Sequence, residues 1–273
     1  MNNRNLLVIL FFSVTLLFSC KDNKNKDVDS VPSYNSEANI PPPPPPPVLD
    51  NKLNVVPIEH ATAVLQWGDI TVYVDPTEGA KAFEGQDDPD LILITDIHGD
   101  HLNVETLQEL NTEDVTIVVP QAVADQLPEV FNSQLKILNN RENTEIKGIK
   151  IEAIPMYNLR EEAKDFHVKG RGNGYVLNLG DQRVYFSGDT EDIPEMRNLQ
   201  NIDKAFVCMN LPYTMTVESA ASAVLDFKPA QVYPYHYRGR PDVSDVEKFK
   251  KLVNEGNPEI EVVLLDWYPN ADY

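Results

Sequence analysis

Four side chains that can bind a metal ion or transfer a proton lie close together in the stretch ITDIHGDHL: Asp96, His98, Asp100 and His101. Imidazole nitrogens and carboxylate oxygens are the atoms with which proteins hold zinc, iron and manganese. In an extended loop, residues two apart point the same way, so Asp96, His98 and Asp100 can converge while His101 points elsewhere. One loop can therefore supply ligands to two metal ions.

Histidines and carboxylates elsewhere in the chain occupy comparable places. Most of them lie at or after the ends of predicted strands, which is where α/β proteins place their sites. We expect His167, Asp189 and His236 to complete the ligand set. The competing interpretation is a group of solvated surface residues, with Asp100 acting only as a turn or helix-capping residue.

Two predicted β-hairpins supply a frame for these residues. ATAVLQW and ITVYVD are joined by Gly68-Asp69, and YVLNL and QRVYFSGD are joined by Gly180-Asp181. The apolar residues and the turns of the two hairpins match at a constant offset of 112 residues. A constant offset favours an internal duplication. Each hairpin also ends near a carboxylate, Asp75 in the first and Asp189 in the second.

Strands and helices alternate through the rest of the folded region. LILIT and VTIVVP are continuous apolar runs, typical of strands that are covered on both faces. Helices are predicted over residues 103–110, VESAASAVLDF and DVEKFKKLV, and strands over AQVYPY and EVVLLDW. This order predicts a mixed α/β domain of two similar halves, with sheets inside and helices outside.

The N-terminus has the pattern of a secretory signal rather than of a folded domain. Arg4 precedes the apolar run LLVILFFSVTLLF, which is followed by Ser19 and Cys20. The sequence LFSC resembles the lipobox of bacterial lipoproteins, in which the cysteine is lipidated, and an uncleaved signal anchor is the alternative. We expect a signal peptide over residues 1–19, a disordered linker with the polyproline spacer Pro41–Pro47 over residues 20–50, and the folded domain over residues 51–273.

These features predict a protein of the bacterial cell envelope, lipid-anchored to a membrane outside the cytoplasm. The formal net charge is −20, and an acidic surface repels the phosphate backbone of nucleic acids. We therefore expect a small-molecule substrate, no nucleic acid, and membrane contact only through the N-terminal lipid.

The ligand loop resembles the His-x-His-x-Asp-His signature of the metallo-β-lactamase superfamily. EHATAVLQWGDITVYVDP resembles its opening hairpin, NGYVLNLGDQRVYFSGDT the strands before its bridging aspartate, and VYPYHY the strand before its last histidine. The resemblance covers residues 53–267, and it is closest to the branch with bacterial ascorbate-phosphate lactonases and N-acyl-phosphatidylethanolamine phospholipases D. It implies an α/β fold, a four-layer αββα sandwich built from two similar halves.

The resemblance also implies two adjacent metal sites that share one bridging carboxylate. The first site would use Asp96, His98 and His167, the second would use Asp100, His101 and His236, and Asp189 would bridge them. Asp75 would hold a ligand histidine in place, and His60 would either do the same or fill a core position beside the first hairpin. Asp100 would also be catalytic, orienting a water molecule or accepting its proton.

Asp96 stands where the family pattern has histidine. The change replaces a nitrogen ligand with an oxygen ligand and adds a negative charge. With His98 and His167 it makes a two-histidine, one-carboxylate set, which suits non-haem iron or manganese as well as zinc. Zinc also accepts aspartate oxygen. We expect a divalent metal, two zinc ions first, with manganese or iron as alternatives.

The ligand set and the resemblance together predict a metal-dependent hydrolase. In such an enzyme a metal-bound hydroxide would attack an ester, a lactone or a phosphodiester. Two alternatives stay open at this point: an iron-dependent oxidoreductase on the same fold, and a non-catalytic binding lipoprotein of the envelope.

Overall fold

The structure, a computed structural model, describes residues 52–269 of the 273-residue chain. The predicted signal peptide, the lipidation site Cys20 and the polyproline linker lie outside the described residues. Within the described part, no helix is both long enough and apolar enough to cross a membrane.

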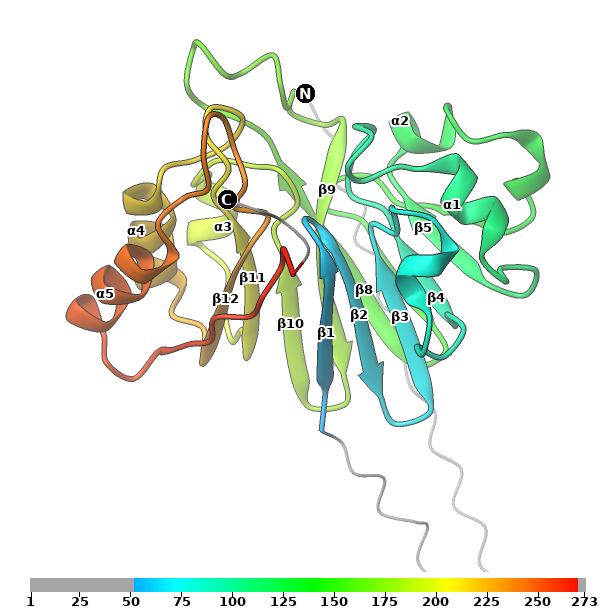
Figure 1. The fold of residues 1–273 in the computed structure, drawn as a ribbon, viewed down its shortest axis with the longest axis horizontal. Coiled ribbons are helices and arrows are strands. Elements are labelled where there is room, and N and C mark those ends of the chain that lie inside the picture. The colour runs from blue at the N-terminus through cyan, green and yellow to red at the C-terminus, as the bar shows by residue number, and fades with distance from the viewer. Residues whose placement is uncertain (1–51, 270–273) are drawn as a thin grey trace, which may run out of the picture. The chain divides into compact units, whose positions relative to one another are not determined.

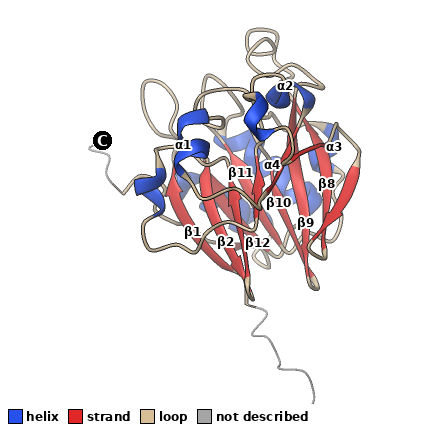
Figure 2. Cartoon of the chain, turned by 90° about the vertical axis from the view of Figure 1, so that its right-hand side faces the viewer, coloured by secondary structure: helices blue, strands red, loops and turns tan. Residues whose placement is uncertain are grey.

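Two β-sheets lie next to each other between layers of helices (Figure 1, Figure 2). The first sheet has the strand order β1-β2-β3-β4-β5-β6, and the second has the order β13-β12-β11-β10-β9-β8-β7. The strands of the first sheet are β1 (Asn54–Glu59), β2 (Thr62–Trp67), β3 (Ile70–Val74), β4 (Leu91–Leu93), β5 (Thr116–Val119) and β6 (Leu135–Ile137). Those of the second are β7 (Asn143–Ile146), β8 (Ile149–Met156), β9 (Gly172–Leu179), β10 (Gln182–Phe186), β11 (Lys204–Cys208), β12 (Gln231–Tyr235) and β13 (Glu261–Val262).

The two predicted hairpins are present and pair in the same register. Val64 of β2 lies opposite Tyr73 of β3, and their counterparts 112 residues later, Val176 and Tyr185, lie opposite each other in β9 and β10. In both sheets the hairpin continues into parallel strands, β4 and β5 in the first and β11 and β12 in the second. The repeated order of pairing fits the two similar halves that the sequence predicts.

Helices cover the outer face of each sheet, which confirms the predicted αββα layering. Along β3, Val72 and Val74 belong to the core cluster that contains Tyr175 of the second sheet, while Tyr73 belongs to the cluster under the helices. This alternation is the period of two that a strand between two apolar layers must have. The helices over the first sheet are η1 (Ala80–Phe83), α1 (Val104–Glu109), α2 (Gln121–Ala124) and η2 (Glu129–Phe131); those over the second are α3 (Pro194–Arg197), α4 (Val217–Phe227) and α5 (Val246–Gly256).

The helix after the ligand loop begins where the sequence predicts. The side chain of Asn103 accepts a hydrogen bond from the backbone N–H of Thr106, 2.8 Å away. This cap satisfies one of the free N–H groups in the first turn of α1. It also fixes the point at which the ligand loop becomes a helix.

The last strand is shorter than the run EVVLLDW predicts. β13 contains only Glu261–Val262, and the chain then leaves the sheet. Trp267 packs edge-on against Phe206 and Tyr235, and its carbonyl oxygen accepts a hydrogen bond from the backbone N–H of His60 at 3.1 Å. The apolar end of the run therefore serves core packing beside the site rather than a longer strand.

Candidate metal centre

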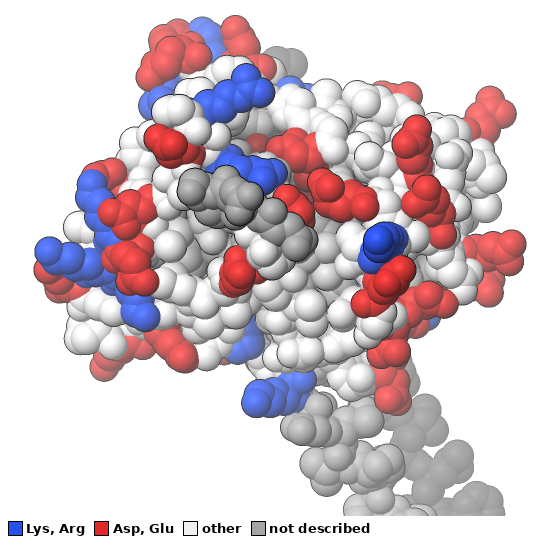
Figure 3. Space-filling view, in the orientation of Figure 1, with Lys and Arg blue, Asp and Glu red and all other residues white. Residues whose placement is uncertain are grey.

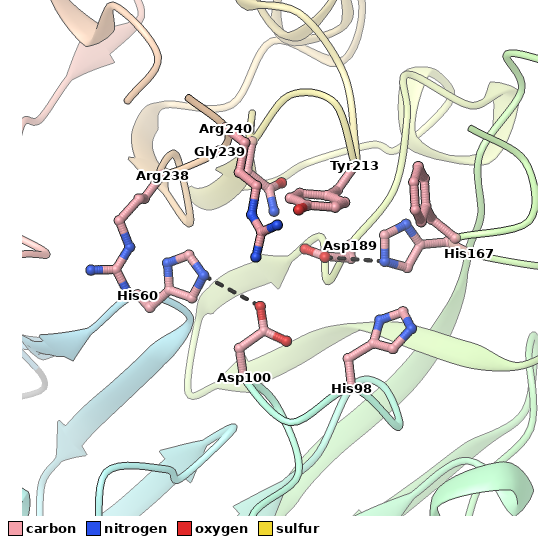
Figure 4. A pocket seen from close by; sticks show the side chains of 11 residues that line it. His60, His98, Asp100, His167, Asp189, Tyr213, Arg238, Gly239 and Arg240 are labelled. Carbon is pink, nitrogen blue, oxygen red and sulfur yellow. Dashed lines mark ion pairs between the residues drawn. The ribbon is translucent and has the colours of Figure 1, made fainter. Parts of the chain in front are cut away.

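The predicted ligands come from loops at one edge of the two sheets, where the strands of both halves end (Figure 4). The loop between β4 and α1 projects from the first sheet, and the loops after β10 and β12 project from the second. Side chains that are distant in sequence therefore meet across the two sheets. The loop after β4 carries Asp96, His98, Asp100 and His101, the loop before β9 carries His167, and Asp189 and His236 follow β10 and β12.

Three residues at this edge have a left-handed backbone. Their φ angles are 57° for His60, 45° for Asp75 and 47° for His236. Such a conformation costs a non-glycine residue on the order of 1–3 kcal/mol, and it persists only where the surrounding structure imposes it. Each of the three begins a turn directly after a strand, so the turn directs the side chain toward the edge.

His101 is held by a buried carboxylate behind it. Nδ1 of His101 lies 2.8 Å from Oδ2 of Asp75, and both side chains are fully buried. Asp75 also accepts hydrogen bonds from the backbone N–H and the hydroxyl of Thr95, both at 2.7 Å. Because Nδ1 of His101 faces an acceptor, the proton of a neutral ring sits there and Nε2 keeps its lone pair for the centre.

Asp189 lies in the middle of the predicted ligands. Its Oδ1 is 3.1 Å from Nε2 of His236, and its Oδ2 is 3.1 Å from Nε2 of His167 and 3.5 Å from Nε2 of His101. The Nε2 atoms of His101 and His236 are themselves 3.1 Å apart. Oδ2 of Asp189 thus lies near one histidine of each predicted site, and Oδ1 lies near a second histidine of the His101 site.

Asp100 and His60 form the rim of the centre next to His236. Oδ2 of Asp100 is 3.5 Å from Nε2 of His236 and 3.3 Å from Nε2 of His60. Nδ1 of His60 lies 2.8 Å from the hydroxyl of Tyr268. His60 therefore contacts one predicted ligand, Asp100, and also stacks edge-on against another, His236.

Asp96 is held by an arginine that the sequence interpretation did not identify. Arg171 donates from Nε to Oδ1 of Asp96 at 3.0 Å and from Nη2 to Oδ2 at 2.7 Å, a two-point ion pair. Nδ1 of His98 is 2.9 Å from Oδ2 of Asp96, whereas Nε2 of His167 is 4.0 Å from it. Both oxygens of the buried carboxylate therefore already have partners.

Burial and neighbouring charges compete in setting the protonation of the centre. Burial alone would raise the pKa of Asp189, but the imidazoles of His236, His101 and His167 hold that pKa well below its usual range. Burial also opposes the charged form of Asp96, yet the hydrogen bonds from His98 and Arg171 lower its pKa. Both carboxylates are therefore ionised at neutral pH, the form that binds cations.

The residues fit a divalent metal. Nε2 of His167 and Oδ1 of Asp189 are buried, and although each lies 3.1 Å from another predicted ligand, neither forms a well-oriented hydrogen bond with a described residue. Such buried atoms are costly unless something satisfies them. A cation with nitrogen and oxygen ligands would satisfy both. Three groups have donor atoms within 4.8 Å of one another: Asp96 with His98 and His167, His101 with Asp189 and His236, and His60 with Asp100 and His236. The first group is the predicted first site, and the predicted second site is divided between the other two.

An open pocket of about 380 Å³ lies over these side chains. Besides the predicted residues, its lining includes Phe166, Asn210, Tyr213, Arg238 and Arg240. The arginines were missed because nothing in their type points to metal chemistry. Their position in the sequence could have identified them, because Arg238 and Arg240 closely follow His236 in a chain that is otherwise acidic.

Comparisons with known proteins agree with this geometry. The chain matches the beta-lactamase superfamily domain over residues 55–236. A UPF0173 metal-dependent hydrolase of Pyrococcus horikoshii is 32% identical over 216 residues, which are 76% of this chain and 93% of that protein. A solved structure from Parabacteroides distasonis, assigned as a metal-dependent hydrolase, is 34% identical with a TM-score of 0.69 and covers 78% of this chain and 92% of its own.

The same fold also occurs in CmlA, a diiron beta-hydroxylase of Streptomyces venezuelae. CmlA is 17% identical to this chain, with a TM-score of 0.59 over 79% of this chain and 53% of CmlA. The predicted superfamily is thus confirmed, while the lactonase and phospholipase branch stays a prediction. The chain belongs to the metallo-β-lactamase superfamily and is related to its UPF0173 metal-dependent hydrolases.

Proposed function

We propose that this protein is a hydrolase that uses a divalent metal centre to activate water against an ester, a lactone or a phosphodiester. One observation carries the proposal: imidazoles and a carboxylate from both halves, His101, His236 and Asp189, face one another next to an open pocket that Asp189 lines. Relatives over most of the chain are named metal-dependent hydrolases, which supports the same reaction class.

The side chains of the centre have separate tasks in this proposal. Asp189 would join two cations, because it lies within 3.5 Å of histidines from both predicted sites, His167 and His101. When bound, a divalent cation lowers the pKa of its water to near neutrality and polarises the substrate oxygen. Asp75 keeps the proton of His101 on Nδ1 and so keeps Nε2 available as a ligand.

Asp100 is the candidate for moving the proton. Its side chain is 41% exposed and lines the pocket, so it reaches both the centre and a bound substrate. Burial and the neighbouring His236 lower the pKa of His60 to about 4, so His60 is neutral at pH 7. A neutral His60 can accept from the hydroxyl of Tyr268 at Nδ1 and donate from Nε2 to Asp100, which holds the carboxylate toward the pocket.

The two predicted metal sites differ in how free their ligands are. Around His101, no lysine or arginine of the described residues 52–269 forms an ion pair with the nitrogen and oxygen atoms that face the centre. Around Asp96, the guanidinium of Arg171 already supplies a positive charge to both oxygens. A second cation there would be repelled by Arg171 and would compete with it. We therefore propose that the His101 side binds metal tightly and that the Asp96 side binds it more weakly.

Metal analysis and activity assays on the full-length protein test the function. We expect zinc or manganese to restore hydrolysis of generic esters, lactones or phosphodiesters to protein stripped of metal. Asp189→Asn should lose metal and most of this activity. Asp69→Asn, the same change in an exposed hairpin turn, should keep both. Full activity and full metal content in Asp189→Asn would contradict the proposal.

An iron-dependent oxidoreductase is the second candidate. Asp96, His98 and His167 form the two-histidine, one-carboxylate composition found in non-haem iron sites, and a diiron hydroxylase shares the fold. Oxygen uptake by iron-loaded protein, together with no hydrolysis by the zinc-loaded form, would favour this candidate.

We also propose that the protein is lipid-anchored at the cell envelope. The proposal depends on the sequence LFSC and on the polyproline spacer that follows it. Mass spectrometry of protein from a bacterial membrane fraction should show acyl chains on Cys20 as the first residue. Recovery of Cys20→Ala in the same processed, acylated form would contradict it.

A further inference from the structure

We propose that the pocket selects substrates that carry an anionic group, a phosphate or a carboxylate, at or beside the bond to be cleaved, and that Arg240 binds this group. The inference rests on the proposed hydrolase function and names its substrate class. It depends on the chemistry of the pocket roof rather than on the metal ligands.

Arg240 differs from most arginines of the described residues in lacking a charged partner among them. Its guanidinium makes no hydrogen bond or ion pair with any residue in the described range 52–269, and it lines the pocket. Figure 4 shows it directed into the space above Asp100 and Asp189, between His60 and Tyr213. An arginine that only stabilised the fold would be expected to have a carboxylate or carbonyl partner.

Arg238, two residues earlier, serves as the contrast. Nη1 of Arg238 lies 3.5 Å from Oε1 of Glu59, and its guanidinium lies over the ring of Tyr268 at 4.8 Å. Figure 4 shows Arg238 directed away from the centre. Arg238 is therefore held by Glu59 and Tyr268, whereas the guanidinium of Arg240 is available to a ligand in the pocket.

The backbone that carries Arg240 is fixed rather than loose. The N–H of Arg240 donates to the carbonyl of Leu211 at 2.8 Å, and the N–H of Gly239 donates to the carbonyl of Asp242 at 3.1 Å. A Cβ added at Gly239 would lie 1.8 Å from the oxygen of Leu211, so only glycine allows this close approach. The base of the arginine side chain is therefore positioned before any substrate arrives.

The backbone of Tyr213, another residue that lines the pocket, is also held by hydrogen bonds. The carbonyl of Tyr213 accepts from Nδ2 of Asn158 at 2.6 Å, and the carbonyl of Thr214 accepts from Nη2 of Arg160 at 2.6 Å. The ring of Tyr213 meets that of Phe166 edge-on at 5.2 Å between centroids. These rings offer an apolar surface for the organic part of a substrate whose charged group lies at Arg240.

The negative charge of the molecule makes a positive side chain in the pocket important for binding an anionic substrate. The chain carries a net charge of −20, and acidic side chains are spread over the face seen in Figure 3. Such a surface repels anions, so an anionic substrate needs a local positive site to enter. A guanidinium matches a phosphate or carboxylate with two parallel hydrogen bonds.

Three matched substrates test the inference on the full-length, metal-loaded protein. They are 4-nitrophenyl acetate, which is neutral, its hemisuccinate analogue, which carries a carboxylate, and bis(4-nitrophenyl) phosphate, which carries a phosphate charge. For Arg240→Gln we expect kcat/KM to fall about 10- to 100-fold on the anionic substrates and less than about threefold on the acetate. Arg240→Lys should recover part of the loss, and Arg141→Gln, which removes an arginine from an exposed pair, should change nothing.

The result also separates phosphate from carboxylate recognition, because a loss on only one anionic substrate identifies the group. Equal losses on all three substrates, or no loss on any, would overturn the inference while leaving the hydrolase function intact. If wild-type protein cleaves none of them, that function fails by itself. Calorimetry with phenylphosphonate then decides: weaker binding to Arg240→Gln by at least about tenfold supports the inference, and unchanged binding overturns it.

Discussion

The side of the centre around His101 and the side around Asp96 both take residues from the loop after β4, but these residues have oppositely charged partners. Asp75 accepts a hydrogen bond from Nδ1 of His101, which leaves Nε2 facing the centre. Arg171 instead donates two hydrogen bonds to Asp96, the carboxylate that would itself be a ligand. One side is prepared for an incoming cation, and the other already contains a cation of the protein.

This difference gives the substitution at position 96 a physical meaning. Where histidine would be a neutral ligand, a buried aspartate needs a compensating charge, because an unpaired buried carboxylate is costly. Arg171 supplies that charge from the strand-preceding loop that also carries His167. The aspartate and the arginine therefore act as one unit.

The largest difference between the two sides should appear when one histidine is removed from each. We expect His236→Ala to lower kcat by about 10³-fold or more and to remove the tightly held metal. His98→Ala should cost less than about tenfold, because it touches only the weaker side. Steady-state kinetics with elemental analysis measures both. Similar losses in the two variants would show that the two sides are equivalent.

Removal of Arg171 tests whether it replaces a metal charge. Arg171→Gln should destabilise metal-free protein by about 2–3 kcal/mol, less than the 3–5 for a fully buried pair, because Arg171 is 18% exposed. Excess zinc or manganese should restore most of that stability. Chemical denaturation measures the free energy of unfolding, and Arg141→Gln, from a pair whose arginine is 73% exposed, should change it by less than about 1 kcal/mol. A loss that metal cannot restore would mean that Arg171 is only structural.

Substitution of Asp75, which lies behind His101, should have a smaller effect and tests the same difference between the two sides. Asp75→Asn should weaken metal affinity by about 10- to 100-fold, because an amide cannot accept from Thr95 and His101 as the carboxylate does. The affinity of the Asp96 side should stay the same. Competition with a coloured chelator measures both affinities, and an unchanged tight site would show that Asp75 does not orient His101.

The sequence predicted most of the frame and the candidate ligands that lie together, but not the charged side chains that pair with them. The hairpins and the capped helix α1 follow from local turn and capping chemistry, so they could be predicted. β13 could not, because the apolar run ends in Trp267, whose burial depends on Phe206 and Tyr235 in other strands. Apolar residues look alike in a sequence whether they form a strand or fill a core.

The candidate site shows the same limit. The histidines and aspartates were identifiable because their type and spacing point to metal chemistry. Arg171 and Arg240 were not, because an arginine is ordinary on any surface and acquires a role only from what it faces. The pairing of Arg171 with Asp96 joins residues 75 positions apart. The guanidinium of Arg240 pairs with none of the described residues, and only its place in the pocket indicates a role.

Metal titration of the stripped full-length protein tests the central claim most directly, that side chains of both halves form one centre with unequal sides. Calorimetry with zinc should show one tight equivalent and a second at least about tenfold weaker, and His236→Ala should lose the tight one. Two equivalents of equal affinity would contradict the unequal sides. No bound zinc, manganese or iron would contradict the centre itself.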